Sequence, residues 1–295
     1  LSLLANLTAH DFGYIYTDQF LERTSNTINT VKKLERYRGH LYNWYHTQSL
    51  QPLPPKYIST VDSGNFAGHL LTLRQGIFEL IHQAVANPKI FDGLLDTFRV
   101  LEEAMNQEDG TIFLEFTSIL ETERNIKSPT LDGIHNSLTR LQTSYESAVE
   151  NIHTKAGSMA EWWKIILSKQ LKQAIDDFQI FSPWISLPNA SLQFTPIIHI
   201  DSQITLGHLC KKIKELIPQL NALKSKDNTI EENEWLSAFQ TSLIQSEERI
   251  KERLACIQKL SIECMDLADM EWDFLYDRSK HLLTIGYKVD EHLCD

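Results

Sequence analysis

This chain of 295 residues is predicted to be mainly α-helical, and three observations support the prediction. Apolar residues recur at three- and four-residue steps over most of the chain, which is the period of an amphipathic helix. Two capping boxes, Ser158 to Glu161 and Thr229 to Glu232, mark helix beginnings. The helical period fails between Arg38 and Thr60, and it changes towards two after Glu271, where a short β-hairpin is expected.

The first helix that can be bounded begins at Thr17, a suitable N-cap, and carries Phe20, Thr24, Ile28 and Val31 on one face. An ordered irregular segment is expected between Arg38 and Thr60, because its prolines remove backbone donors and disfavour helix in the residues before them. A helix is predicted to resume near Ser63. Pro88 fits the first turn of the next helix.

Longer helices are expected from about Thr130 onwards. The first has a stripe formed by Leu131, Ile134, Leu138, Leu141, Tyr145, Ala148 and Ile152. Further helices open at Ser158, near Thr205 and at Thr229, and the last of them is the longest. Core packing is the favoured interpretation for the tryptophans on these stripes and in the hairpin, which are Trp162, Trp163, Trp235 and Trp272. The hairpin is expected from Phe274–Tyr276 and Leu282–Tyr287, with a polar turn between them.

Charge and composition exclude several classes of function. The formal net charge of −11 disfavours nucleic acid as a partner. No apolar run reaches the roughly 18 to 20 residues that cross a bilayer, so this segment is expected to make no direct membrane contact. The four cysteines lack zinc-site spacing and fit reduced thiols. His40, His46 and His69 lack metal-site spacing, so no metal and no cofactor are expected.

The segment from Arg36 to Leu70 carries the candidate chemistry, because aromatic rings alternate there with short polar side chains. Ring faces stack on sugar C–H groups, and amides, hydroxyls and carboxylates bond sugar hydroxyls. For the residues around His40, Asn43, Trp44 and Tyr45, a buried aromatic plug is an equally good interpretation. For Asp62, Ser63 and Asn65, the alternative to sugar binding is a helix cap made by Asp62 or Ser63.

Several motifs resemble the central, glucoamylase-like region of bacterial cyclic β-1,2-glucan synthases. They are Leu4-Ala-Asn-Leu-Thr-Ala-His-Asp-Phe-Gly-Tyr14, Leu34-Glu-Arg-Tyr-Arg-Gly-His-Leu-Tyr-Asn-Trp-Tyr45, Leu50-Gln-Pro-Leu53, Tyr57-Ile-Ser-Thr-Val-Asp-Ser-Gly-Asn65, Asp273-Phe-Leu-Tyr-Asp277 and Leu283-Thr-Ile-Gly-Tyr287. The resemblance covers about residues 1–75 and 270–293. One departure is His46, which stands where the family usually has Asp after Trp-Tyr.

The resemblance implies a partial (α/α)6 barrel with extra long helices. Residues 1–75 would supply its first helices and sugar-site loop, residues 76–270 a long helical region, and residues 271–295 the hairpin leading into the rest of the barrel. The parent would close linear β-1,2-glucan into rings by retaining transglycosylation, which needs two carboxyl groups. Those glutamates are expected after Asp295, so the catalytic residues are unknown.

The resemblance also implies a parent at the cytoplasmic face of the bacterial inner membrane, in which this soluble segment is linked to a membrane-embedded glucosyltransferase and a phosphorylase-like region. The resemblance implies β-1,2-glucan as the binding partner. The expected sugar contacts are Asp62, Ser63 and Asn65, with Asn43, Trp44 and Tyr45 at the rim and Arg38 and His40 as supports. Two alternatives stay open: an endo-β-1,2-glucanase, and a non-catalytic helical interaction module.

Overall fold

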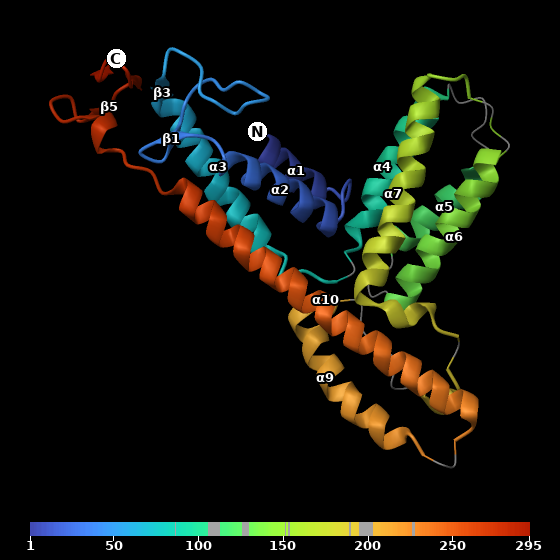
Figure 1. Cartoon of the computed structure of the whole chain (residues 1–295). Coiled ribbons are helices and arrows are strands. Elements are labelled where there is room, and N and C mark those ends of the chain that lie inside the picture. Colours follow the sequence, from blue (N-terminus) through green and yellow to red (C-terminus); the bar gives the residue numbers. More distant parts are fainter. Residues whose placement is uncertain are drawn as a thin grey trace. The chain divides into compact units, whose positions relative to one another are not determined.

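A computed structural model describes residues 1–85, 87–105, 113–125, 130–150, 152, 154–188, 190–194, 203–225 and 228–295. Within these residues the protein is mainly helical with small antiparallel sheets, as the sequence predicts. The chain divides into two compact units (Figure 1). Unit 1 comprises residues 1–7, 20–80 and 256–295, and unit 2 comprises residues 8–19 and 81–255. Unit 1 therefore draws its residues from both ends of the chain.

Unit 1 contains parts of three helices and the whole of a fourth. They are the first residues of α1 (Ser2–Asp11), α2 (Thr17–Val31) from Phe20 onwards, α3 (Thr60–Glu79), and α10 (Ile230–Ala268) from Cys256 onwards. In α2 the predicted apolar face is buried at Phe20, Thr24 and Ile28, and Val31 is half-buried. The predicted start of α3 near Ser63 is three residues too late. The helix begins at Thr60, because Ser59 accepts the Asp62 N–H at 3.2 Å and acts as the N-cap.

The strands of unit 1 are short and form three small antiparallel sheets. The first pairs β1 (Arg36–Tyr37) with β2 (His40–Leu41). The second has the order β3 (Tyr57–Ser59), β6 (Gly286–Lys288), β7 (Leu293–Cys294). The third, β4 (Tyr276–Asp277) with β5 (Leu282–Leu283), is the predicted hairpin and follows the 3-10 helix η4 (Asp273–Leu275). The pairing of β3 with β6 joins residues more than 200 positions apart in the sequence.

Unit 2 is built around α4 (Lys89–Ala104), α5 (Leu114–Arg124), α6 (Leu131–Glu150) and α7 (Met159–Phe181), which pack as neighbours (Figure 1). Their core includes an aromatic cluster of Phe98, Phe113, Phe116 and Tyr145, with ring centroids 5.1–6.4 Å apart. The predicted stripe of α6 is buried from Leu131 to Ala148, and Ile152 beyond it is buried as well.

One core prediction in unit 2 is wrong. Trp162 is 51% exposed, and it packs edge-on against its half-buried neighbour Trp163 at a centroid distance of 4.7 Å. The buried face of α7 is instead formed by Ala160, Leu167 and Leu171. Adjacent helix positions point about 100° apart, so both tryptophans cannot face the same core.

The rest of unit 2 comprises the 3-10 helices η2 (Pro183–Ser186) and η3 (Leu192–Phe194), α9 (Leu206–Leu223) and the first part of α10. Thr205 caps α9, and at the start of α10 the backbone N–H and the hydroxyl of Thr229 are both bonded to Glu232, at 3.0 and 3.1 Å. Lys214 of α9 and Glu247 of α10 form an ion pair at 3.9 Å. Among the described residues, no helix has the length and apolar character needed to cross a membrane.

Candidate functional site

The candidate site is built on the hairpin β1–β2 of unit 1. Arg38 and Gly39 form its two-residue turn with φ of 52° and 91°, and positive φ at both central positions is typical of a type I′ turn. A Cβ atom at Gly39 would lie 3.0 Å from the Asp269 carbonyl oxygen, so glycine also permits the turn to pack against the backbone after α10. The hairpin is thereby fixed to the end of α10.

Arg38 supports this contact with its side chain. Its carbonyl accepts the Glu271 N–H at 3.1 Å, and its guanidinium lies 3.7 Å from the Glu271 carboxylate. The same guanidinium lies 5.2 Å from the centre of the Phe274 ring, within the range of a cation–π contact. Arg38 therefore connects the hairpin to the segment that precedes β4.

His40 is fully buried behind this turn, and both ring nitrogens have partners. Nε2 lies 2.7 Å from the Glu271 carbonyl oxygen, which can only accept, so Nε2 carries the hydrogen. Nδ1 then accepts a hydrogen bond from the Ser63 hydroxyl at 2.9 Å. Burial lowers the pKa of His40, opposed by the bond to the Glu271 carbonyl. A neutral imidazole thus joins β2 to the first turn of α3.

Tyr42 and Tyr45 give the aromatic segment its internal structure. The Tyr45 hydroxyl accepts the Tyr42 N–H at 2.9 Å and donates to the Glu35 carbonyl at 2.7 Å. Tyr42 is buried in a small core with Ile58 and Leu275. Both tyrosines therefore fit the plug interpretation.

Asn43 and Trp44 differ from the tyrosines because they are exposed, Trp44 at 49%. The Asn43 N–H donates to the Tyr57 carbonyl at 3.0 Å, and the Trp44 carbonyl accepts the Leu53 N–H at 2.9 Å. These bonds fix the backbone on both sides while the side chains stay accessible. The segment thus combines a structural plug with an exposed indole and amide.

The loop after Trp44 explains how the chain accommodates His46. Its Nδ1 accepts the Gln48 N–H at 3.3 Å and the Ser49 N–H at 3.1 Å. An aspartate carboxylate makes the same kind of bond to backbone groups two and three residues ahead. The imidazole of His46 therefore accepts the backbone bonds that hold this turn.

The first two turns of α3 carry the remaining candidates. Because Ser59 is the cap, the expectation of a cap made by Asp62 or Ser63 is wrong. Ser63 is 5% exposed and bonded to His40, whereas Asp62 and Asn65 are exposed. Residues three apart on a helix lie on neighbouring surface positions, so Asp62 and Asn65 present a carboxylate and an amide side by side.

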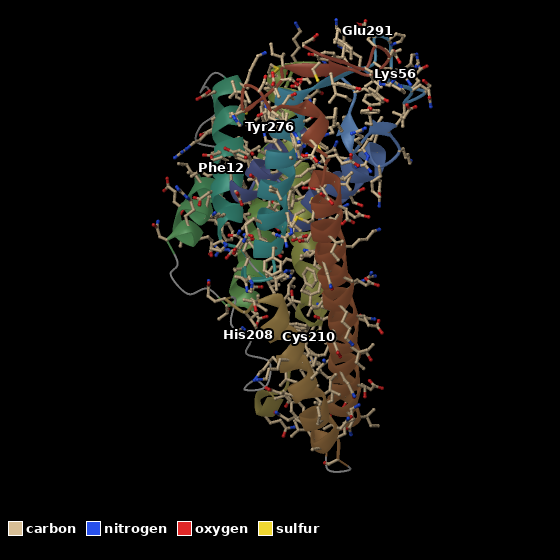
Figure 2. The ribbon with its side chains drawn as sticks, turned by 90° about the vertical axis from the view of Figure 1, so that its left-hand side faces the viewer. Phe12, Lys56, His208, Cys210, Tyr276 and Glu291 are labelled. Carbon is tan, nitrogen blue, oxygen red and sulfur yellow. The ribbon has the colours of Figure 1, made fainter. Side chains whose placement is uncertain are left out.

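The C-terminal segment lies beside these residues through the β3–β6 pairing, in which Ser59 faces Gly286. The Thr60 N–H donates to the Ile285 carbonyl at 3.1 Å, and the Val289 N–H to the Lys56 carbonyl at 2.9 Å. Figure 2 labels Lys56, which precedes β3, and Glu291, which lies between β6 and β7, at the end of unit 1 where these strands pair. Within unit 1, residues 56–60 of one motif-carrying region are thus adjacent to residues 285–289 of the other.

A stretch of 106 residues, 36% of this chain, is 40% identical to the cyclic beta-(1,2)-glucan synthase NdvB of Rhizobium meliloti (strain 1021). The resemblance to the cyclic β-1,2-glucan synthases is confirmed. This chain covers only about 4% of the length of the synthase NdvB. No family model matches the chain.

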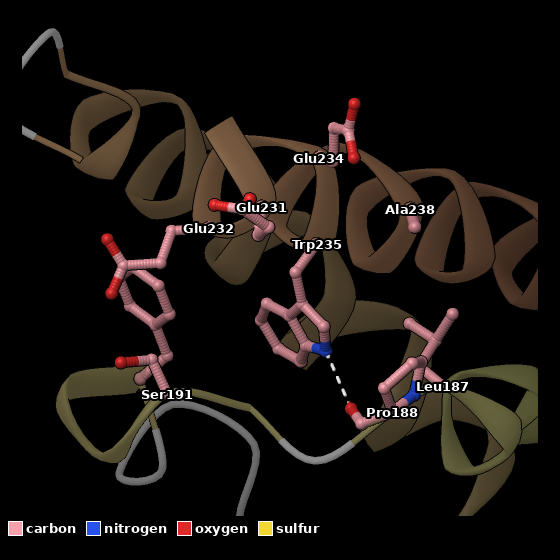
Figure 3. A pocket seen from close by; sticks show the side chains of 9 residues that line it. Leu187, Pro188, Ser191, Glu231, Glu232, Glu234, Trp235 and Ala238 are labelled. Carbon is pink, nitrogen blue, oxygen red and sulfur yellow. Dashed lines mark hydrogen bonds between the residues drawn. The ribbon is translucent and has the colours of Figure 1, made fainter. Parts of the chain in front are cut away.

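A cavity of about 500 Å³ lies elsewhere, in unit 2 (Figure 3). Its walls include Leu187, Pro188 and Phe194, and the indole N–H of Trp235 donates to the Pro188 carbonyl at 2.9 Å. None of the described residues that line it is among the eight predicted sugar-site residues, and sequence reasoning gave no signal for it. In the described part of the chain, no cluster of three His, Cys, Asp or Glu residues could hold a metal ion.

Proposed function

We propose that this chain is part of a protein of the cyclic β-1,2-glucan synthase kind and that unit 1 contributes to its glucan-binding surface. The 40% identity to the synthase NdvB over 106 residues carries the proposal. The finer expectations belong to it as well: the unit would form part of an (α/α)6 barrel, and the parent would close β-1,2-glucan into rings by retaining transglycosylation. The parent would also carry the membrane-embedded and phosphorylase-like regions, at the cytoplasmic face of the inner membrane.

Within unit 1, the proposed glucan contacts are Asn43, Trp44, Asp62 and Asn65. All four are exposed, and together they offer one indole face, two amides and one carboxylate. The Asn43 N–H is bonded to the Tyr57 carbonyl, and β3 leads directly into the first two turns of α3, which carry Asp62 and Asn65. A glucosyl ring needs such a mixture, because its C–H face stacks and its hydroxyls donate and accept.

The other four predicted residues support this surface from behind. Ser63, His40 and Tyr45 use their polar atoms in internal hydrogen bonds, and Arg38 contacts Glu271 and Phe274. We therefore propose that these residues position the glucan-contacting side chains. The predicted division at residues 75 and 270 stays a proposal about how the barrel is interrupted along the chain.

The test compares matched variants in their affinity for linear β-1,2-glucan, measured by titration calorimetry. Trp44→Ala is paired with Trp162→Ala, whose indole is exposed to nearly the same extent in unit 2. Asp62→Asn is paired with Glu79→Asn at the opposite end of α3. A loss of roughly tenfold is expected for the Trp44 and Asp62 variants only, since one stacking or charged hydrogen-bond contact contributes about 1–1.5 kcal/mol.

Equal affinities of all four variants would contradict the proposed roles of Trp44 and Asp62 in glucan binding. Product analysis of a full-length protein carrying this segment tests the reaction itself. Cyclic products support ring closure, whereas linear products alone would support the endo-β-1,2-glucanase alternative.

A further inference from the structure

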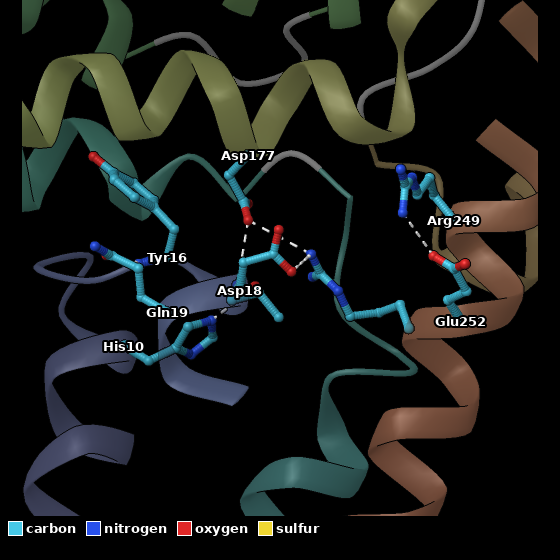
Figure 4. A network of polar contacts seen from close by, with 9 residues as sticks. His10, Tyr16, Asp18, Gln19, Asp177, Arg249 and Glu252 are labelled. Carbon is cyan, nitrogen blue, oxygen red and sulfur yellow. Dashed lines mark hydrogen bonds and ion pairs between the residues drawn. The ribbon is translucent and has the colours of Figure 1, made fainter. Parts of the chain in front are cut away.

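Unit 2 contains a cluster of charged side chains, two of them largely buried and one half-exposed, that the proposed function does not use (Figure 4). Arg253 of α10 is 7% exposed, and its guanidinium is paired with the carboxylate of Asp18, in the first turn of α2. The same guanidinium lies 3.6 Å from the carboxylate of Asp177 on α7. The Asp18 N–H also donates to Asp177, at 3.3 Å. Three helices therefore meet at one guanidinium.

The charges in this cluster are unequal in number. Two carboxylates face one guanidinium, and the Asp177 side chain is only 18% exposed. The charged form of Asp177 is therefore unfavourable in free energy, because burial penalises the charge and the Asp18 carboxylate repels it. The Arg253 guanidinium also lies 4.5 Å from the centre of the Phe181 ring, which further restricts its hydration.

Other titratable groups around Asp177 add no compensating charge. Tyr16 is buried, and burial raises the pKa of its hydroxyl, with a further rise from the Asp177 charge, so Tyr16 is neutral. On α1, His10 is bonded to Thr17 at 3.1 Å, and burial lowers the pKa of its imidazole. His10 is therefore neutral at pH 7. Arg253 therefore provides the positive charge for both carboxylates.

We propose that Asp177 is a proton-binding site whose protonation in mild acid stabilises unit 2. Uptake of one proton leaves a single carboxylate, Asp18, paired with a single guanidinium, Arg253. The Asp177 carboxylate takes the proton from solvent, and no other covalent bond changes. The contact of α2, α7 and α10 at this point then becomes more stable as the pH falls.

The pKa of Asp177 is shifted in the direction that this inference requires. Burial raises the pKa of Asp177 to about 6, with a further rise from Asp18, against the lowering effects of Arg253 and of the Asp18 N–H. Since this pKa lies above the ordinary value of 3.8, the folded protein binds the proton more tightly than the unfolded chain, by roughly 100-fold. The stabilisation is fully present below the unfolded pKa and is lost as the pH rises through about 6.

The test is a pH titration of the whole chain with ¹³C-labelled aspartate carboxyl groups, followed by NMR. The wild type is expected to show one carboxyl with a midpoint near 6. Asp177→Asn should remove that transition, whereas Asp176→Asn, at the exposed neighbouring position, should leave it unchanged. Asp18→Asn should move the midpoint to lower pH, because it removes the repelling charge.

The inference is overturned if no aspartate titrates above about pH 5, since that is the range of ordinary carboxyl groups. It is equally overturned if the transition persists in Asp177→Asn. If Asp177→Asn does not fold, the Asp18→Asn titration decides: an unchanged midpoint contradicts the proposed shared guanidinium.

Discussion

The imidazole of His40 and the hydroxyl of Ser63 are hydrogen-bonded at 2.9 Å inside unit 1. They come from β2 and α3, 23 residues apart, and the second ring nitrogen of His40 continues the link to the Glu271 carbonyl. The first turn of α3 is therefore fixed to two other segments from its buried side. This internal link thereby helps to position the exposed residues Asp62, in the same turn, and Asn65, in the next.

Removing the Ser63 hydroxyl is expected to destabilise unit 1. In Ser63→Ala the Nδ1 atom of the buried His40 loses its donor, which costs about 1–3 kcal/mol in the free energy of unfolding. Urea denaturation measures this loss. Ser168→Ala, at an exposed position of α7, is the control and should change stability by less than about 0.5 kcal/mol. Equal stability of the two variants would contradict the described link.

His40 should have the opposite effect to Asp177 and make unit 1 less stable in acid. Burial lowers its pKa in the folded state, so the folded protein binds a proton less readily than the unfolded chain. The stability that the neutral ring contributes is present above the unfolded pKa of about 6.5 and is lost as the pH falls through the lower folded value. Native-state hydrogen exchange at β3 should show weaker protection at pH 5 than at pH 7, after correction for intrinsic rates. His40→Gln should lose this difference.

Helix signals that are local in the sequence could be predicted, whereas contacts between distant segments could not. The stripe of α6 and the Thr229 capping box were predicted because their signals lie within a few residues of one another. The Ser59 cap was missed, since the extended strand that places it pairs with Gly286, far along the chain. The burial of His40 and Ser63 and the exposure of Trp44 depend on the same distant contacts, so composition alone left both interpretations open.

Tyr45 tests the structural half of the aromatic segment. Tyr45→Phe leaves the Tyr42 N–H and the Glu35 carbonyl without the hydroxyl, and the expected loss is about 1–3 kcal/mol of unfolding free energy. Trp44→Phe is the control, because the Trp44 side chain is 49% exposed and its backbone bond is unaffected. Thermal unfolding should show a lowered midpoint for the Tyr45 variant alone. If both variants keep the wild-type midpoint, the Tyr45 bridge has no structural importance.

Gly286 tests the sheet that joins the two motif-carrying regions. A Cβ atom there would overlap the Tyr57 ring and the Ile58 carbonyl oxygen, so Gly286→Ala must push β6 away from β3. Overpacking of this kind typically costs about 1–3 kcal/mol. Gly68→Ala in α3 is the matched control, because its Cβ would meet nothing within 4 Å, and alanine in a helix interior should instead stabilise by about 0.5–1 kcal/mol. In urea denaturation, the midpoint should therefore be lowered for Gly286→Ala and raised for Gly68→Ala. A Gly286 variant as stable as the wild type would mean that β3 and β6 are not paired in this register.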